Sequence, residues 1–144
     1  MDEIRITPEN ITEDLIGAYD IFVFGSNESG IHGAGAARFA KDKLGFPVGM
    51  GFGMRPEDNA FAIPTKDWNL VTLPKETINF YIQRFKDYVE FTLKFNPALT
   101  FFVTKLGCGL AGYTPEDIAP MFKEFVNLEN VYLPQEFWDI INKQ

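Results

Sequence analysis

Lys66 and Asp67 stand side by side at the end of the segment AIPTKD (Ala62 to Asp67), whose composition is typical of a strand end. A lysine acts as a nucleophile only when its pKa is depressed and a partner group assists it. Asp67 is one candidate partner, and Asp117 in the segment TPED is another. The alternative interpretation is that Lys66 is a solvated surface lysine, the usual state of this residue type.

Cys108 and His32 are the only cysteine and the only histidine of the chain, and both lie in glycine-rich segments. A thiol with a histidine base is a nucleophilic pair, but Leu106 and Leu110 occupy the places where a nucleophile elbow has glycines. We therefore interpret Cys108 as a small residue in a ligand-binding loop. His32 either contacts a ligand or hydrogen-bonds within its own loop. With one residue of each type, the sequence predicts neither a disulfide nor a metal site.

Two glycine loops, FGSNESGIHGAGA and GCGLAGY, each follow an apolar strand and precede a helix. In open α/β sheets such loops hold phosphates, because helix N-termini and free backbone N–H groups favour anions. The alternative is that these glycines only permit tight turns. Ile31 and His32 stand where a P-loop needs lysine and serine or threonine, so an NTPase is disfavoured. The G-x-x-G-x-G spacing of Gly30 to Gly35 also reverses the dinucleotide fingerprint.

Composition and charge narrow the class of protein further. The 144 residues, 46% of them hydrophobic, suit one domain spanning residues 1–144. The net charge of −7 makes duplex nucleic acid a poor partner, so a small ligand is expected. The start MDEIRIT lacks the pattern of a signal peptide, and no apolar run reaches the roughly 18 to 20 residues of a membrane span. We therefore expect a soluble, cytoplasmic protein without membrane contacts.

The elements that would position these residues alternate between strand and helix. Strands are predicted at 4–7, 20–25, from 59 to Pro64, 99–106 and 130–134. Helices are predicted at 34–44, 74–96 and 135–142, with a third segment at 114–125 that Pro120 divides into a turn and a restarted helix. Thr114 and Asp117 form a capping-box pattern at its start. This order predicts a three-layer α/β/α domain with a central mixed sheet.

Three segments, taken in order, resemble those of macrodomains, which bind ADP-ribose. HGAGAARFAKDKLG (His32 to Gly45) is similar to the small-residue loop and helix of the branch that contains the human terminal ADP-ribose glycohydrolase. AIPTKD is similar to the lysine-bearing strand end of that branch, and LGCGLAGY (Leu106 to Tyr113) to its second loop. ENIT (Glu9 to Thr12) falls where macrodomains carry a Gly-Asp-Ile-Thr segment. The likeness runs from residue 4 to residue 133.

The resemblance implies a macrodomain-like fold and a role for each matching residue. Asn10 would lie near the adenine, in place of the usual aspartate, and Asn27 near the distal ribose. Lys66 matches the catalytic lysine of the branch, whereas Ala111 stands where its second-loop acid is expected. The diphosphate would lie between two loops, which consist of His32, Gly33, Ala34, Gly35 and Ala36 on one side and Gly107, Cys108, Gly109, Leu110, Ala111, Gly112 and Tyr113 on the other. Phe52 and Trp68 are candidates for stacking on the base.

Three functional hypotheses follow. The first is a module that binds ADP-ribose, or a related nucleotide diphosphate derivative, and hydrolyses an ADP-ribosyl linkage through Lys66 and Asp67 without a cofactor. The second is a non-catalytic reader of ADP-ribose or of an ADP-ribosylated target, which the alanine at position 111 favours. The third is a protein-interaction domain with structural glycine loops and an exposed apolar patch built by the terminal EFWDII segment.

Overall fold

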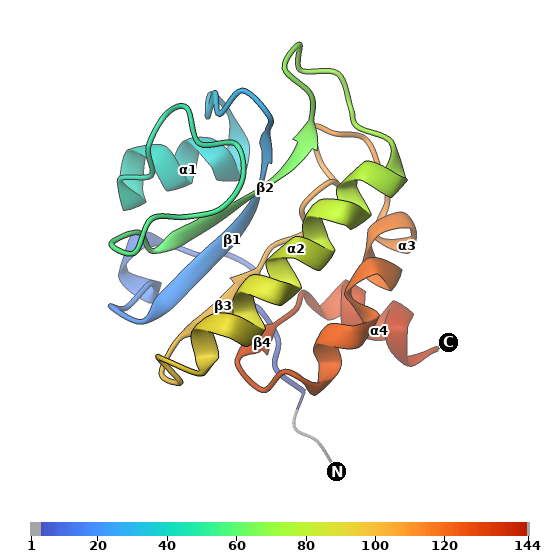
Figure 1. Ribbon diagram of the computed structural model, residues 1–144. Coiled ribbons are helices and arrows are strands. Elements are labelled where there is room, and N and C mark those ends of the chain that lie inside the picture. Colours follow the sequence, from blue (N-terminus) through green and yellow to red (C-terminus); the bar gives the residue numbers. More distant parts are fainter. Residues whose placement is uncertain (1–3, 144) are drawn as a thin grey trace.

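The computed structural model describes residues 4–143, which form an α/β fold around one parallel sheet (Figure 1). The strands are β1 (Asp20–Asn27), β2 (Ala60–Lys66), β3 (Thr100–Val103) and β4 (Val131–Tyr132), in the spatial order β2-β1-β3-β4. The helices are α1 (Gly35–Leu44), α2 (Lys75–Leu93), α3 (Pro115–Ile118) and α4 (Gln135–Asn142), with 3-10 helices η1 (Glu13–Leu15) and η2 (Ala119–Asn127).

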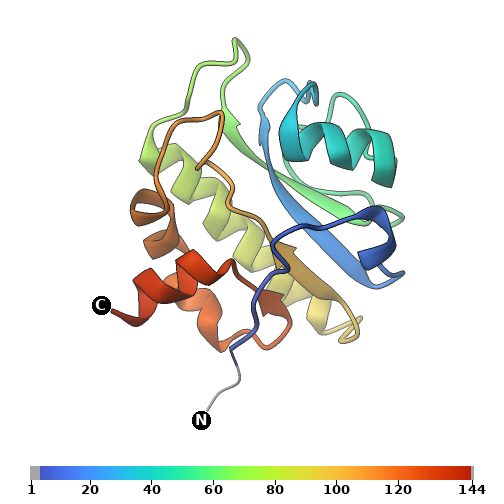
Figure 2. The same cartoon turned by 180° about the vertical axis from the view of Figure 1, so that it is seen from behind.

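Helices cover both faces of the sheet, so the predicted three-layer architecture is confirmed. α1 and α2 lie on opposite faces, and α3, η2 and α4 gather at the β4 end (Figures 1 and 2). The sheet is less mixed than expected, because all three strand pairs are parallel. Antiparallel pairing is confined to isolated bridges, such as the one between Gly53 and Ala62.

β1 is an inner strand because both of its faces are apolar. Ile21 and Val23 pack into the larger core on the α2 side, whereas Phe22 and Phe24 pack into the smaller core beneath α1. This alternation places each face of the strand against a different helical layer. Because β1 pairs in parallel with both β2 and β3, the carboxyl ends of these three strands lie at the same edge of the sheet.

Two predicted strands differ from those observed. Pro64 does not end the strand at 59–64, since β2 continues through it to Lys66. A proline is tolerated there because β2 is an edge strand, and the β1–β2 register also shifts just beyond it, between Ser26 and Asn27. The predicted strand at 4–7 is reduced to one parallel bridge between Ile6 and Leu133.

The predicted helices agree closely with the observed ones. In α2, Ile78, Ile82, Phe85 and Val89 are all buried, as their spacing of four and three residues requires. α1 ends at Gly45, whose φ of 70° is the left-handed C-cap conformation. In α3, the Thr114 side chain and the Asp117 side chain form the predicted capping box.

The terminal EFWDII segment forms α4 and contributes to the core instead of to a surface patch. Phe137, Trp138 and Ile141 are buried in the larger core. The Trp138 Nε1–H also donates a hydrogen bond of 2.7 Å to the Arg5 carbonyl. The apolar patch that the protein-interaction hypothesis required at this segment is therefore absent from the described structure.

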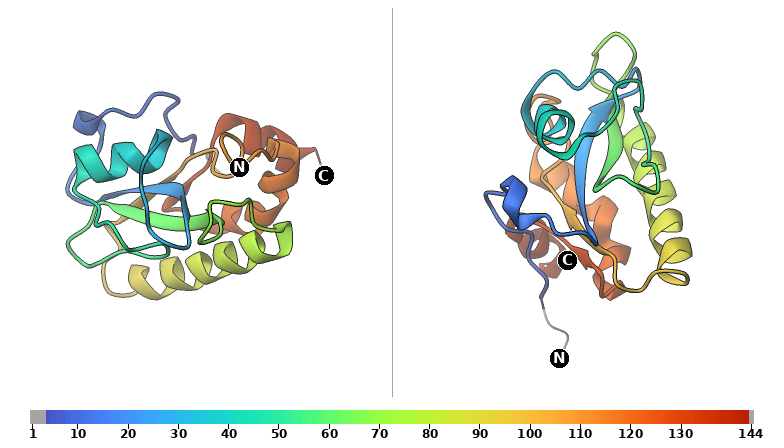
Figure 3. Two further views of the ribbon diagram at one scale, coloured as in Figure 1. Left: turned by 90° about the horizontal axis from the view of Figure 1, so that it is seen from above. Right: turned by 90° about the vertical axis from the view of Figure 1, so that its left-hand side faces the viewer.

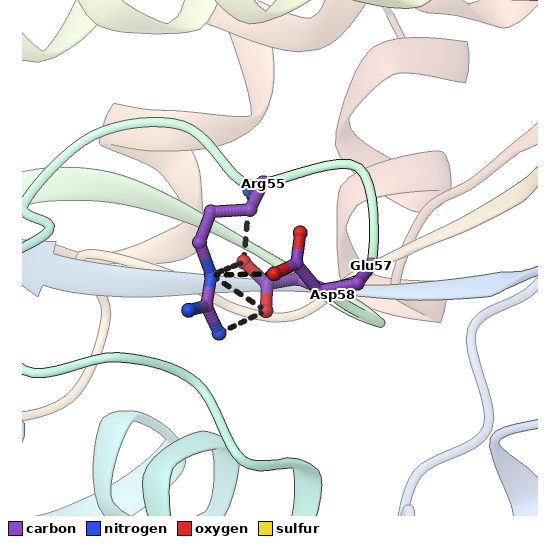
Figure 4. Close-up of polar contacts among 3 residues, drawn as sticks. All are labelled: Arg55, Glu57 and Asp58. Carbon is purple, nitrogen blue, oxygen red and sulfur yellow. Dashed lines mark hydrogen bonds and ion pairs between the residues drawn. The ribbon is translucent and has the colours of Figure 1, made fainter.

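The loop that leads into β2 is held by a buried carboxylate (Figure 4). Asp58 is buried and accepts hydrogen bonds from the Arg55 backbone N–H at 2.8 Å and from the Arg55 Nη2 at 2.8 Å. The guanidinium also lies 3.8 Å from Glu57. The hydrogen bond to Asp58 is the main cause that raises the pKa of Arg55, and this pairing fixes the chain before it enters the sheet.

No helix within residues 4–143 is both long enough and apolar enough to cross a lipid bilayer. This agrees with the absence of long apolar runs in the sequence.

Candidate functional site

The first glycine loop is shaped by the Asn27 side chain at the end of β1. Its amide nitrogen donates to the Ile31 carbonyl at 2.6 Å, and its oxygen accepts from the Ile31 N–H at 2.9 Å and from the Ser29 hydroxyl at 2.7 Å. The Ser26 hydroxyl donates to the Gly51 carbonyl, which ties this loop to the 49–53 segment. The Asn27 carboxamide therefore holds the loop in shape through hydrogen bonds to Ile31 and Ser29.

A cavity of about 470 Å³ lies beyond the carboxyl ends of β1 and β2, next to the segment that follows β3. It brings together both glycine loops and the Lys66 strand end, as the sequence predicts for a ligand site. Its lining includes Asn27, Gly33, Ala34, Gly35, Ala36, Lys66, Lys105, Gly107, Gly109, Leu110 and Ala111. We call this space the first cavity.

The first turn of α1 lines the first cavity and is suited to an anion. The N-cap residue Ala34 has an extended backbone and offers no side-chain hydrogen bond to the helix, and the first turn carries no acidic residue. The N–H groups of an uncapped first turn carry partial positive charge. Lys66 and Lys105 line the same cavity, so its charged side chains are cationic. A phosphate group would therefore be stabilised there.

Gly33 and Gly109 are glycines that the fold itself does not require. Neither has a positive φ, and a Cβ at either position would have no atom of the described residues within 4 Å. Both residues line the first cavity. By contrast, Gly107 has a φ of 79° and its Cβ would lie 3.1 Å from Ile118. The open space at Gly33 and Gly109 is what close approach of a ligand to the backbone would need.

A second cavity, of about 810 Å³, adjoins the first and shares Gly35, Ala36, Thr104 and Lys105 with it. Phe22 and Phe39, whose ring centroids are 5.0 Å apart, form an aromatic part of its wall. Its lining also includes Glu9, Asn10, Ile11 and Glu136. Asn10 thus lies in a separate compartment from Lys66.

The aromatic residues that the sequence suggested for base stacking lie elsewhere. Phe52 packs against Phe61 at 5.3 Å and Tyr81 at 5.5 Å, on the α2 side of the sheet. Trp68 is 69% exposed and lines neither cavity. Phe22 and Phe39 line the second cavity instead, although their positions in a predicted strand and a predicted helix indicated core packing.

Within residues 4–143, Asp67 and Lys66 form no ion pair with each other, and the Asp67 carboxylate has backbone partners instead. Its carboxylate accepts hydrogen bonds from the backbone N–H groups of Asn69 at 2.8 Å and Val71 at 3.0 Å, which closes the turn after β2. Leu70 in this turn has a φ of 64°, unusual for a branched side chain, and it lines the first cavity. The structure therefore places Lys66 in the cavity and Asp67 in the turn that supports it.

Asp117, the other candidate partner of Lys66, also has partners elsewhere. The Asp117 carboxylate accepts from the Thr114 backbone at 3.1 Å and lies 3.4 Å from Lys75. Among the residues that the structure describes, none of those lining the first cavity is an aspartate or a glutamate. Ala111 does line it, and its carbonyl accepts from the Thr72 hydroxyl at 2.7 Å.

Cys108 is partly buried against the larger core, and its side chain does not line either cavity. Burial raises the pKa of its thiol to about 11, so the thiolate is scarce at neutral pH. This agrees with the interpretation of Cys108 as a small loop residue. Tyr113 is also structural, since its hydroxyl donates to the Leu73 carbonyl at 2.7 Å, and Gly112 lines neither cavity.

His32 is buried and lines neither cavity. Its ring packs at 5.6 Å from Phe24 and 5.3 Å from Phe46, and its Nε2 lies 3.1 Å from the Met50 carbonyl. Desolvation by burial lowers the pKa of His32, although the Met50 and Pro47 carbonyls act in the opposite direction. His32 thus joins the first glycine loop to the 47–50 segment.

Protonation of His32 is expected to destabilise the fold. The unfolded chain takes up this proton at a pH near 6.5, whereas the folded chain resists it, so stability should fall as the pH drops below about 6.5 and level off below the folded pKa. One such proton contributes at most about 1.4 kcal/mol per pH unit. Urea unfolding at several pH values between 7.5 and 5 measures the slope. His32→Gln should remove it, and an unchanged slope in that variant would contradict the assignment.

Lys105 is the main site residue that the sequence did not reveal. It lines both cavities, and its ammonium lies 2.9 Å from Glu136 of α4, a hydrogen bond that raises the pKa of Lys105. It was assigned to the interior of a strand at 99–106, but β3 ends at Val103. Its position directly after an apolar strand and before a glycine loop was the available signal.

These features define an α/β domain with a two-compartment cleft at the carboxyl ends of parallel strands, lined by a helix N-terminus and two lysines. No protein-family model matches this chain, and no curated protein matches its sequence. A solved structure, that of a protein of unknown function from Bacteroides thetaiotaomicron, is similar to it, with a TM-score of 0.62 and 14% sequence identity. The match covers 93% of this chain and 98% of that one. At this identity the likeness supports the shared fold alone.

Proposed function

We propose that this chain binds ADP-ribose, or a related nucleotide diphosphate derivative, across the two joined cavities. One observation carries the proposal: the cavities meet at Gly35, Ala36, Thr104 and Lys105, beside the uncapped first turn of α1. A ligand with an anionic centre and a neutral group at each end matches this arrangement. The macrodomain-like loops and strand end support the same ligand.

Each part of the ligand has a matching environment. The diphosphate would lie against the first turn of α1, near Lys105. The base would enter the second cavity, where Phe22 and Phe39 provide an aromatic wall and Asn10 provides a carboxamide for polar recognition. The distal ribose would enter the first cavity, towards Lys66.

The experiment is isothermal titration with ADP-ribose, with AMP and ribose 5-phosphate as controls. Saturable binding of ADP-ribose that is much tighter than binding of either control is expected, because only the whole ligand occupies both cavities. Thermal stabilisation by ADP-ribose should accompany it. Equal affinity for AMP and ADP-ribose, or no binding, would contradict the proposal.

Gly33→Ala provides a specific test of the glycine loop. The new methyl group meets no described atom, and alanine restricts the unfolded chain, so stability should stay unchanged or rise by up to about 1 kcal/mol. Affinity for ADP-ribose should nevertheless fall by about tenfold or more, because the methyl group takes space that the diphosphate needs. Gly17→Ala, outside both cavities, is the control for ligand affinity, and its Cβ would lie 3.2 Å from the Asp20 carboxylate, a flexible side chain. Unchanged affinity in Gly33→Ala would argue against close backbone approach.

Hydrolysis of an ADP-ribosyl linkage is a second candidate function, favoured by the position of Lys66 in the first cavity. The absence of a lining acid among the described residues favours the reader instead. Turnover should be measured on several linkages with the wild type and with Lys66→Ala. Turnover that disappears in the variant while binding persists would identify an enzyme. Binding without wild-type turnover on any linkage would identify a reader.

A further inference from the structure

The outer face of α2 carries large apolar side chains that the core does not use. Phe80 is 57% exposed and Phe91 60% exposed, on the side of the helix opposite the buried Ile78, Ile82, Phe85 and Val89. α2 is the outermost element on its side of the sheet, and no other element passes in front of it (Figures 1 and 3). Two exposed phenylalanines on one side of an outermost helix make that side a candidate contact surface, which the charges between them help to define.

Phe80, Arg84, Asp87 and Phe91 follow one another at intervals of four, three and four residues, so they share one face of the helix. We call these four residues the α2 face. All four are exposed. The Arg84 guanidinium lies over the Phe80 ring, 5.7 Å from its centroid. Within residues 4–143, neither Arg84 nor Asp87 has an ion pair, whereas the neighbouring Lys86 and Glu90 pair with each other at 3.3 Å.

The α2 face is complementary to itself in the antiparallel direction. Phe80 and Phe91 are equally far from the helix position midway between Phe85 and Lys86, and so are Arg84 and Asp87. When two copies of α2 pack around a two-fold axis at this midpoint, Phe80 of each copy meets Phe91 of the other. Arg84 of each copy then meets Asp87 of the other. A parallel pair would instead bring each charge against its like.

We propose that two copies of this chain associate through the α2 face in this antiparallel arrangement. The opposite charges select the antiparallel direction and the phenylalanines supply the apolar contact. A single helix face is a small interface, of less than about 1,200 Å², so the dimer is weak and its population depends on concentration. Neither cavity is lined by a residue of α2, so a dimer formed through this helix leaves the cavities of both copies accessible. It would present two clefts to a target that carries two ligands.

Charge exchange tests the pairing directly. Sedimentation equilibrium of the wild-type chain over a range of concentrations should show a monomer–dimer equilibrium. Arg84→Asp brings two acidic pairs together in the homodimer, and Asp87→Arg brings two basic pairs together. Each variant alone should therefore dimerise at least about tenfold more weakly than the wild type. Mixing the two variants should restore dimers, because each pair then joins an acidic side chain of one variant to a basic side chain of the other. The double exchange Arg84→Asp with Asp87→Arg should also restore the homodimer.

Two control substitutions distinguish association through the α2 face from nonspecific hydrophobic association. Phe80→Ser should weaken the dimer, whereas Val48→Ser, which removes an apolar side chain that is 67% exposed outside α2, should not. These residues are exposed, so the variants are expected to fold, and circular dichroism checks this. A wild-type chain that stays monomeric at every concentration would overturn the proposal. A dimer that ignores both charge variants, or a mixture that fails to associate, would also overturn it.

Discussion

Phe85→Ala is expected to lower the free energy of unfolding by about 3 to 5 kcal/mol. Phe85 is fully buried on α2, and its ring centroid lies 4.8 Å from that of Phe61, 5.7 Å from Phe101 and 5.6 Å from Phe125. These rings belong to β2, β3 and η2, so one side chain joins three elements to the helix. Alanine would leave a cavity where all four elements meet, and the surrounding rings cannot close it without moving the sheet.

Chemical denaturation at low protein concentration measures this loss. Phe91→Ala is the matched control, because it removes the same side chain from the same helix at a position that is 60% exposed. The control should change stability by no more than about 0.5 kcal/mol. A loss below about 1 kcal/mol for Phe85→Ala would show that the larger core is not packed as described.

Gly51→Ala is expected to lower both stability and ligand affinity. A Cβ at Gly51 would lie 2.5 Å from the Asn27 carbonyl oxygen and 2.7 Å from the Glu28 carbonyl oxygen. Both atoms belong to the backbone, so relief of the clash must move the first glycine loop. The Asn27 carbonyl also accepts the Gly30 N–H at 3.0 Å, and this hydrogen bond would be strained. Such overpacking costs about 1 to 3 kcal/mol.

The contrast with Gly33→Ala makes this prediction specific. Thermal unfolding and ADP-ribose titration of both variants should show that position 51 affects the fold and the site together, whereas position 33 affects the site alone. If Gly51→Ala is as stable as the wild type, the close approach of the 27–31 and 49–53 segments described above is wrong.

Helices were predictable because their signals are local. The apolar spacing predicted the buried face of α2 and the bounds of α4, Pro74 precedes the first residue of α2, and Gly45 ends α1, although α2 ends at Leu93, before the predicted end at 96. The capping box of Thr114 and Asp117 was equally clear. In each case the deciding contacts lie within one turn of helix.

What the sequence could not reveal depends on contacts between distant segments. Pro64 is compatible with a strand only because β2 lies at the sheet edge, which local composition does not specify. Asp67 next to Lys66 suggested a catalytic pair, but the direction of a carboxylate depends on the turn that follows. His32 was ambiguous because its aromatic neighbours Phe24 and Phe46 come from two separate segments.

The two short bridges at the sheet borders protect the protein from edge-to-edge aggregation. Gly53 exchanges two hydrogen bonds with Ala62 along the outer side of β2. Beyond β4, the Thr7 N–H donates to the Leu133 carbonyl and the Leu133 N–H donates to the Arg5 carbonyl. An open border with unpaired N–H and C=O groups would recruit strands from other chains into a growing fibre. Both bridges, together with Pro64 in the outer strand, shorten the stretch of backbone with which a strand of another chain could pair at each border.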